Sequence, residues 1–246
     1  MLTPRLYVGE ERQPPVPGEE YRLDDTLARH AGAALRMRVG DRIALFTGTG
    51  GEFSATIRSI DRRAVVVHVD SHDAVERESS WPLTLAQSII ASDMMDIVVR
   101  KAIELGVASI VPLIAARSQQ ASDERTERRL AHWRRIVIAA CEQCGRNRVP
   151  VIAPVATFAQ WIADRRALHP IAILGAEGER SLAAFAAETP PRVIVAGPEG
   201  GFDAAELRLA RNTGAVAVHL GRRVLRAETA ALAAIATVNA IAGDAQ

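Results

Sequence analysis

Residues 192–211 read RVIVAGPEGGFDAAELRLAR, and they place an apolar strand, a glycine-rich loop and an amphipathic helix in direct succession. Asp203 and Glu206 stand three residues apart at the start of the helix, in the pattern of a capping box. The glycines let a ligand approach the backbone closely, and Glu199 among them suits hydroxyls or positive charge better than phosphate. The spacing fits neither a Walker loop nor the dinucleotide fingerprint. A tight turn between strand and helix is the alternative interpretation.

Strands and helices alternate on both sides of this stretch, from about residue 81 to the end of the chain. We expect strands at residues 83–90, 109–114, 149–154, 171–174, 192–196 and 215–220. We expect helices at residues 95–105, 124–144, 158–168, 181–187, 204–211 and 228–242. This alternation predicts an α/β fold with a mostly parallel sheet covered on both faces. Ligands of such sheets bind at the carboxyl ends of the strands, so the loops after Leu174, Ala196 and Leu220 are the expected site.

The N-terminal part of the chain is predicted to be β-rich. Strand patterns occur at residues 5–8, 41–46, 52–60 and 64–69, with a helix beginning at Asp24 or Asp25 and running to about residue 37. A glycine-rich turn at residues 47–51 joins two of the strands, which favours a small barrel. Residues 71–80 are polar and are expected to form a linker. The sequence therefore predicts two domains, residues 1–72 and residues 73–246.

Composition excludes several classes of protein. Apolar residues make up 48% of the chain and charged residues 24%, which are globular values and argue against a disordered chain or a rod. The apolar stretch 229–241 is too short to span a bilayer, and the first twenty residues lack the apolar core of a signal peptide. With two cysteines and no export signal, we expect a cytoplasmic protein.

Arginine dominates the basic residues, since Lys101 is the single lysine among 30 basic side chains. The net charge is +1, but residues 117–148 hold eight arginines against four acidic residues, an excess that can contact phosphates. Genome composition also explains a preference for arginine. Lys101 and Glu104 are spaced for an ordinary surface ion pair, although a lone lysine can also mark a functional position.

Two further segments concentrate polar groups. Cys141 and Cys144 lie at the C-terminal end of a predicted helix, which argues against a redox or zinc site, so we expect no metal. Glu142 and Arg146 follow at helical spacing, as a hydrogen-bonding or simply solvated helix end. The loop after residue 220 packs three arginines into five residues, which indicates recognition of an anion or nucleic acid, or a solvated turn.

Several of these stretches together resemble one family. The matching segments are Arg5, residues 34–36 (ALR), 39–41 (VGD), 101–107 (KAIELGV), Pro112 with 117–118 (RS), 139–150, 197–201 (GPEGG) and 220–230 (LGRRVLRAETA). They cover most of the chain, and the last two are the most specific. The chain resembles the RsmE-type 16S rRNA uridine-N3 methyltransferases of the SPOUT superfamily.

The resemblance implies a PUA-like RNA-binding barrel followed by a SPOUT domain with a mostly parallel sheet and a trefoil knot, active as a homodimer. The cofactor would be S-adenosylmethionine, and the substrate 16S rRNA within the 30S subunit. The implied cofactor-binding residues are Leu174, Gly175, Ala196, Gly197, Pro198, Glu199, Gly200, Gly201, Leu220, Gly221, Val224, Leu225, Arg226, Thr229 and Ala230.

The resemblance also implies roles in catalysis and RNA binding. Arg226 would stabilise negative charge developing on the uracil. Glu142, Arg146 and Lys101 would orient the base or the phosphates, either within one subunit or from the other subunit. The implied RNA-binding residues are Arg5, Arg36, Lys101, Arg117 and Arg148. Two alternatives stay open: an enzyme of this superfamily that acts on another RNA, and a non-catalytic RNA-binding homologue.

Overall fold

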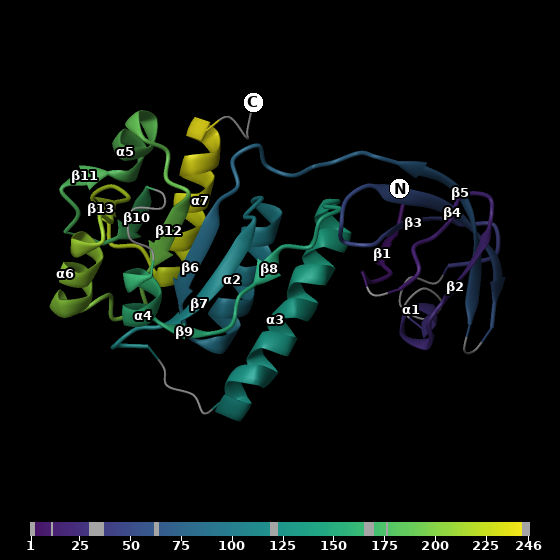
Figure 1. The fold of residues 1–246 in the computed structure, drawn as a ribbon, viewed down its shortest axis with the longest axis horizontal. Helices are drawn as coiled ribbons and strands as arrows, with labels where there is room; N and C mark the ends of the chain where they lie inside the picture. Colours follow the sequence, from purple (N-terminus) through teal and green to yellow (C-terminus); the bar gives the residue numbers. More distant parts are fainter. Residues whose placement is uncertain are drawn as a thin grey trace. The chain divides into compact units, whose positions relative to one another are not determined.

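The computed structural model describes residues 3–10, 12–29, 37–61, 64–118, 123–164, 170–175 and 177–242. Figure 1 shows the chain as a ribbon. Its contacts divide it into two compact units, Met1–Glu78 with Cys141–Val149, and Ser79–Ala140 with Pro150–Gln246. Unit 1 thus runs past the expected boundary at residue 72, and it takes in a segment that the sequence placed in the second domain.

Unit 1 is built on a five-stranded sheet. Its strands are β1 (Arg5–Tyr7), β2 (Glu20–Leu23), β3 (Arg42–Phe46), β4 (Glu52–Ile60) and β5 (Val65–Asp73), with helix α1 at Asp25–Arg29. They lie in the order β1-β3-β4-β5-β2, and all pairs are antiparallel except β1 with β3. β2 was not expected from the sequence. The first residues of the expected linker, up to Asp73, continue β5 instead, because they pair with β4.

Alternation of side chains along the strands produces the core of unit 1. In β4, Phe53, Ala55 and Ile57 are buried while Ser54 and Arg58 are exposed, the two-residue period of a strand with one buried face. The core is completed by apolar side chains of the other strands, among them Leu6, Leu23, Ile43, Leu45, Val65, Val67 and Val69.

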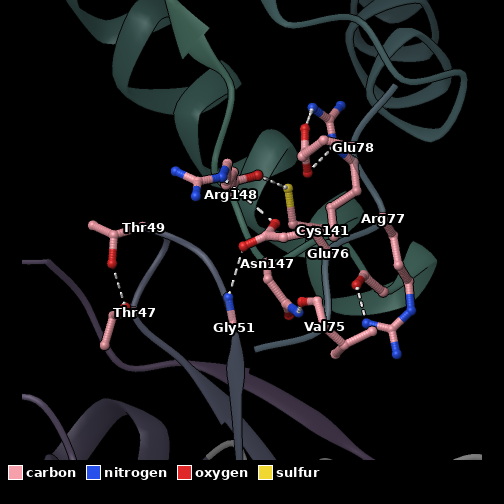
Figure 2. Close-up of polar contacts among 12 residues, drawn as sticks. Thr47, Thr49, Gly51, Val75, Glu76, Arg77, Glu78, Cys141, Asn147 and Arg148 are labelled. Atoms are coloured by element: carbon pink, nitrogen blue, oxygen red, sulfur yellow. Dashed lines mark hydrogen bonds and ion pairs between the residues drawn. The ribbon is translucent and has the colours of Figure 1, made fainter. Parts of the chain in front are cut away.

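The segment Cys141–Val149 is held in unit 1 by buried polar contacts. It begins in the last residues of α3 (Asp123–Cys144). Asn147 is fully buried, and its Nδ2 donates to the carbonyl oxygen of Val75 at 2.8 Å (Figure 2). Its Oδ1 accepts a hydrogen bond from Arg5. Its backbone oxygen accepts from the N–H of Gly50 at 3.2 Å. Buried polar groups are costly unless they are paired, so these bonds fix the segment in place.

Ion pairs surround Asn147. Glu52 accepts hydrogen bonds from Arg5 and from Arg77, and Arg77 also donates to the carbonyl oxygen of Gly145 at 2.9 Å. Burial alone raises the pKa of Glu52, but the hydrogen bonds and charges of Arg77 and Arg5 outweigh it and hold the pKa below its usual value. The pairing therefore stabilises unit 1 above the ordinary carboxyl pKa, and this stabilisation is lost as the pH falls through the lowered value.

Unit 2 contains an eight-stranded sheet. Its strands are β6 (Thr84–Ser88), β7 (Ser109–Ile114), β8 (Val151–Ile152), β9 (Ala156–Thr157), β10 (Ile171–Leu174), β11 (Arg180–Ser181), β12 (Val193–Ala196) and β13 (Val216–His219). The strand order is β11-β13-β10-β12-β6-β7-β8, with β9 beside β7, and every pair is parallel. The expected α/β fold is confirmed. β8 is shorter than expected, because Val149 donates to Gly48 in unit 1 instead of pairing in this sheet.

Helices cover the sheet of unit 2. They are α2 (Ser92–Glu104), the first part of α3, α4 (Phe158–Ala163), α5 (Leu182–Glu188), α6 (Ala204–Asn212) and α7 (Ala227–Ala242). α7 packs on β12, β6, α2 and α5, while α4 packs on α6. Val193 and Val195 of β12 belong to the same hydrophobic cluster as the buried side chains of α4. Ile194 lies between them in the strand, so its side chain points to the opposite face of the sheet. Within the described residues no helix is both long and apolar enough to cross a bilayer.

We predict that Asn147→Ala destabilises the protein by about 1–3 kcal/mol, because it removes the fully buried amide that binds both the carbonyl of Val75 and the guanidinium of Arg5. Urea unfolding followed by circular dichroism measures the loss. Asn212→Ala is the matched control, because Asn212 is exposed at the end of α6. The control should change the free energy of unfolding by less than about 0.5 kcal/mol. Equal effects of both substitutions would contradict the role given to Asn147.

Candidate functional site

A pocket of about 690 Å³ opens at the carboxyl edge of the unit 2 sheet. Its walls come from the residues that follow four neighbouring strands, β13, β10, β12 and β6. The volume lies in the range of sites for small ligands and cofactors. β6 and β12 are hydrogen-bonded neighbours in the sheet. The chain continues from β6 to β7 on one side of this pair and from β12 to β13 on the other side, so the pocket lies at a topological switch point. Open α/β sheets bind their ligands there.

The glycine loop after β12 forms one wall. Gly201 has φ of 66°, which side-chain-bearing residues rarely adopt, and a Cβ on Gly197 would lie 3.2 Å from the Phe202 ring. Asp203 and Glu206 form the expected capping box at the start of α6. The loop after β7 braces this wall, because Arg117 donates to the carbonyl oxygen of Gly200 at 2.7 Å.

Glu199 joins the glycine loop to the start of α2. Its carboxylate accepts a hydrogen bond from the N–H of Ala91 at 2.8 Å, and no side chain of α2 itself caps this terminus. A carboxylate at a helix N-terminus accepts a hydrogen bond from an N–H group that has no partner within the helix. Its negative charge also interacts favourably with the positive end of the helix dipole. Glu199 therefore has a structural role in the pocket wall, and its carboxylate also contributes negative charge to the lining of the pocket.

The loop after β13 forms the opposite wall. His219 Nδ1 accepts a hydrogen bond from the N–H of Gly221 at 3.1 Å, which fixes the start of the loop. At the other end the carbonyl oxygen of Arg226 accepts from the N–H of Ala230 as α7 begins. Between these anchors Arg222, Arg223 and Val224 are exposed at the pocket. The loop is thus short, held at both ends and densely cationic.

The pocket brings together all the predicted cofactor-binding residues except Gly200 and Thr229. Gly200 lies in the same loop with Arg117 against it, and Thr229 is an exposed residue of the first turn of α7. Arg226, the predicted catalytic residue, lines the same pocket. Binding and catalysis by these residues stay predictions.

Other lining residues were not among the predicted cofactor-binding residues, although Arg222, Arg223, Ala227 and Glu228 belong to the loop that the sequence singled out. They are Ala91, Met94, Val218, His219, Arg222, Arg223, Ala227 and Glu228. Most of them adjoin predicted residues along the chain, so a wider loop boundary would have included them. Ala91 and Met94 carry no such signal, because they join the pocket only through the pairing of β6 with β12.

Glu142 and Arg146 lie in unit 1 and are not among the residues that line the pocket of unit 2. The carboxylate of Glu142 accepts from the N–H of Tyr7 at 3.0 Å. Arg146 is 4% exposed and donates to both carboxylate oxygens of Glu78. Their contacts support a structural role in unit 1.

The predicted RNA-binding residues have partners of their own. Arg5 binds Glu52 and Asn147, and Arg148 pairs with Glu76 at 3.5 Å, all within unit 1. Lys101 pairs with Glu104 at 2.8 Å in α2, and Arg117 holds the glycine loop. Arg36 lies outside the described residues.

The two cysteines do not form a disulfide, and Cys141 is buried. Burial raises the pKa of Cys141 to about 12, so its thiol stays protonated and weakly reactive at neutral pH. In the described part of the chain no group of three or more His, Cys, Asp or Glu side chains could hold a metal ion.

Fold and pocket together define an α/β protein that takes a small ligand at the carboxyl edge of a parallel sheet. A family model described as an RNA methyltransferase domain matches residues 77–239, more than half of the chain, and an RNA methyltransferase PUA domain matches residues 23–70. The ribosomal RNA small subunit methyltransferase E of Rickettsia conorii is 32% identical, over 87% of this chain and 86% of its own length. The Buchnera aphidicola (Acyrthosiphon pisum) enzyme of that name is 26% identical, over 98% and 94%.

A solved structure gives the same result. The Neisseria gonorrhoeae ribosomal RNA small subunit methyltransferase E, crystallised with S-adenosylmethionine, is 34% identical and superposes with a TM-score of 0.89 over 98% of each chain. The chain therefore belongs to the family of ribosomal RNA small subunit methyltransferase E. The family resemblance inferred from the sequence is confirmed.

We predict that Glu199→Ala lowers the stability of the cofactor-free protein by about 0.5–2 kcal/mol, the usual loss when a helix loses its cap. Glu199→Gln keeps an acceptor oxygen for Ala91 and should recover most of this loss. Chemical denaturation of both variants measures the difference. Glu177→Ala, at an exposed loop position, is the control and should leave stability unchanged. Wild-type stability in Glu199→Ala would show that the cap contributes nothing.

Proposed function

We propose that this protein transfers a methyl group from S-adenosylmethionine to N3 of a specific uridine in the 16S rRNA of the small ribosomal subunit. The observation that carries the proposal is the pocket, which gathers the three predicted loops at the switch point of the sheet in a chain of this family. The finer points of the proposal are the uridine, its N3 atom and the cofactor.

The pocket residues suit S-adenosylmethionine. Backbone groups of the glycine loop and of the loop after β13 can hydrogen-bond the edge of an adenine, and Glu199 and Glu228 offer carboxylates to hydroxyl or cationic groups. When bound, the cofactor supplies an electrophilic methyl group.

Residues of the protein must stabilise the negative charge that develops on the uracil. N3 of uridine carries a proton near neutral pH, and as this proton leaves, negative charge develops on the ring. A fixed cation close to that charge stabilises the transition state because it needs no reorganisation. Arg226 is the proposed cation, since it lines the pocket at the end of an anchored loop. The base must also be unstacked to enter the pocket.

Partners and setting complete the proposal. Unit 1 is proposed to grip rRNA, with residues 1–72 as its RNA-binding part and Arg148 among its contacts. Unit 2 is proposed to carry the trefoil knot and to act as a homodimer in the cytoplasm, on the 30S subunit. For Arg5, Glu142 and Arg146 the contacts inside unit 1 support positioning of the segment Cys141–Val149, so any effect of theirs on activity would act through that segment.

The decisive experiment is methyl transfer from labelled S-adenosylmethionine to 30S subunits from a strain that lacks this protein. We expect 3-methyluridine in the small-subunit rRNA, identified by mass spectrometry. Label on another RNA, or on another nucleoside, would overturn the proposed substrate. Failure to bind the cofactor would favour a non-catalytic RNA-binding protein, and cofactor binding without transfer to 30S subunits would favour another RNA as the substrate.

We predict that Arg226→Ala lowers kcat by roughly 10²–10³-fold, the usual effect of removing one group that stabilises developing negative charge. The dissociation constant of S-adenosylmethionine, measured by calorimetry, should change far less. Arg211→Ala, on the exposed face of α6, is a charge-matched control and should behave as the wild type. If affinity and turnover fall equally, Arg226 binds the cofactor and does not act on the base.

A further inference from the structure

Three arginines at the mouth of the pocket lack partners within the described part of the chain. The side chains of Arg222, Arg223 and Arg226 are exposed, and none makes a hydrogen bond or ion pair with another described residue. Between them Val224 is 89% exposed, more than any other large hydrophobic residue that the structure describes. We call residues 222–226 the arginine loop.

The other described cations suggested for RNA binding have partners within the protein. Arg5 and Arg148 pair with carboxylates of unit 1, Lys101 pairs with Glu104, and Arg117 binds a backbone carbonyl. Each of these cations already has a partner, which a phosphate would have to displace or share. No described carboxylate forms an ion pair with the arginines of the arginine loop, so their positive charge is available to a polyanionic ligand.

The geometry points to the arginine loop as the surface that docks the RNA strand at the pocket, with Arg222 and Arg223 on phosphates and Val224 against the face of a base. This inference rests on the proposed function and names the substrate contact of the same site. The occupant is a single-stranded segment of RNA, because an unstacked strand presents phosphates and exposed base faces together.

Two features favour RNA over a second copy of this chain. Like charges brought together across an interface repel, so a two-fold contact centred on this loop would set the arginine cluster against its own copy. The loop is also held at both ends, by His219 with Gly221 and by the first turn of α7. A surface positioned in this way contacts a ligand with little ordering cost.

The test is the salt dependence of binding to in-vitro-transcribed 16S rRNA, with cofactor at saturation. In the double variant Arg222→Gln/Arg223→Gln, we expect the slope of log K against log salt to flatten by roughly 1.4, since each phosphate contact on a single strand contributes about 0.7. The KM for 30S subunits should rise at least tenfold, while the cofactor dissociation constant changes less than threefold.

Arg208→Gln/Arg211→Gln is the matched control, because it removes the same charge from exposed positions of α6 in the same unit. The control should keep the wild-type slope. A wild-type slope in the loop variant, or an equal flattening in the control, would overturn the inference. If the wild type itself neither binds nor methylates rRNA, the proposed function fails and the inference falls with it.

Val224→Ser separates the base contact from the charge. We expect a higher KM for 30S subunits with an unchanged salt slope, because the substitution removes an apolar surface and leaves both arginines on their phosphates. Val151→Ser is the control, since Val151 is 66% exposed in the same unit and lies on β8. An unchanged KM would contradict the proposed contact between Val224 and a base. A change of oligomeric state in Val224→Ser, measured by sedimentation, would instead place this residue in an interface with a second copy of the chain.

Discussion

The parallel pairing of β12 with β6 is the constraint on which the site depends. Val193–Ala196 lie beside Thr84–Gln87, and this pairing puts the ends of two strands from distant parts of the chain next to each other. The glycine loop can then reach α2, so that Glu199 caps Ala91. With β10 and β13 on the far side of β12, four loops close around one space. Without this pairing the same loops would be separate turns.

Unit 1 depends on a different principle, the satisfaction of buried polar groups. Its sheet has an ordinary apolar core, yet Arg5, Glu52, Glu78 and Arg146 are drawn into contacts of low exposure. Removing one member of such a group leaves its partners unsatisfied, which costs more than the bond contributes. The segment Cys141–Val149 supplies several of these partners, and so it is as much a part of the unit as the strands are.

The sequence predicted the local elements of the site well, because they depend on local chemistry. The capping box of Asp203 and Glu206, the strand before Gly197 and the helix after Arg226 are encoded within a few residues. Ala91 could not be found in this way, since its place in the pocket follows from strand order. For Arg5 and Arg146 the sequence showed nothing of their partners, because burial beside carboxylates is visible only in three dimensions.

The discontinuity of unit 1 has a consequence for the chain as it leaves the ribosome. Domains generally fold as units and in the order of synthesis, but the buried partners of Arg5, Glu78 and Val75 lie in Cys141–Val149. At roughly 5–20 residues per second, the nascent N-terminal sheet waits for several seconds before this segment is made. During that interval the polar groups of Arg5, Glu78 and Val75 lack the partners that they have in the folded protein. Translation speed across the first part of unit 2 thus sets how long these polar groups wait for their partners.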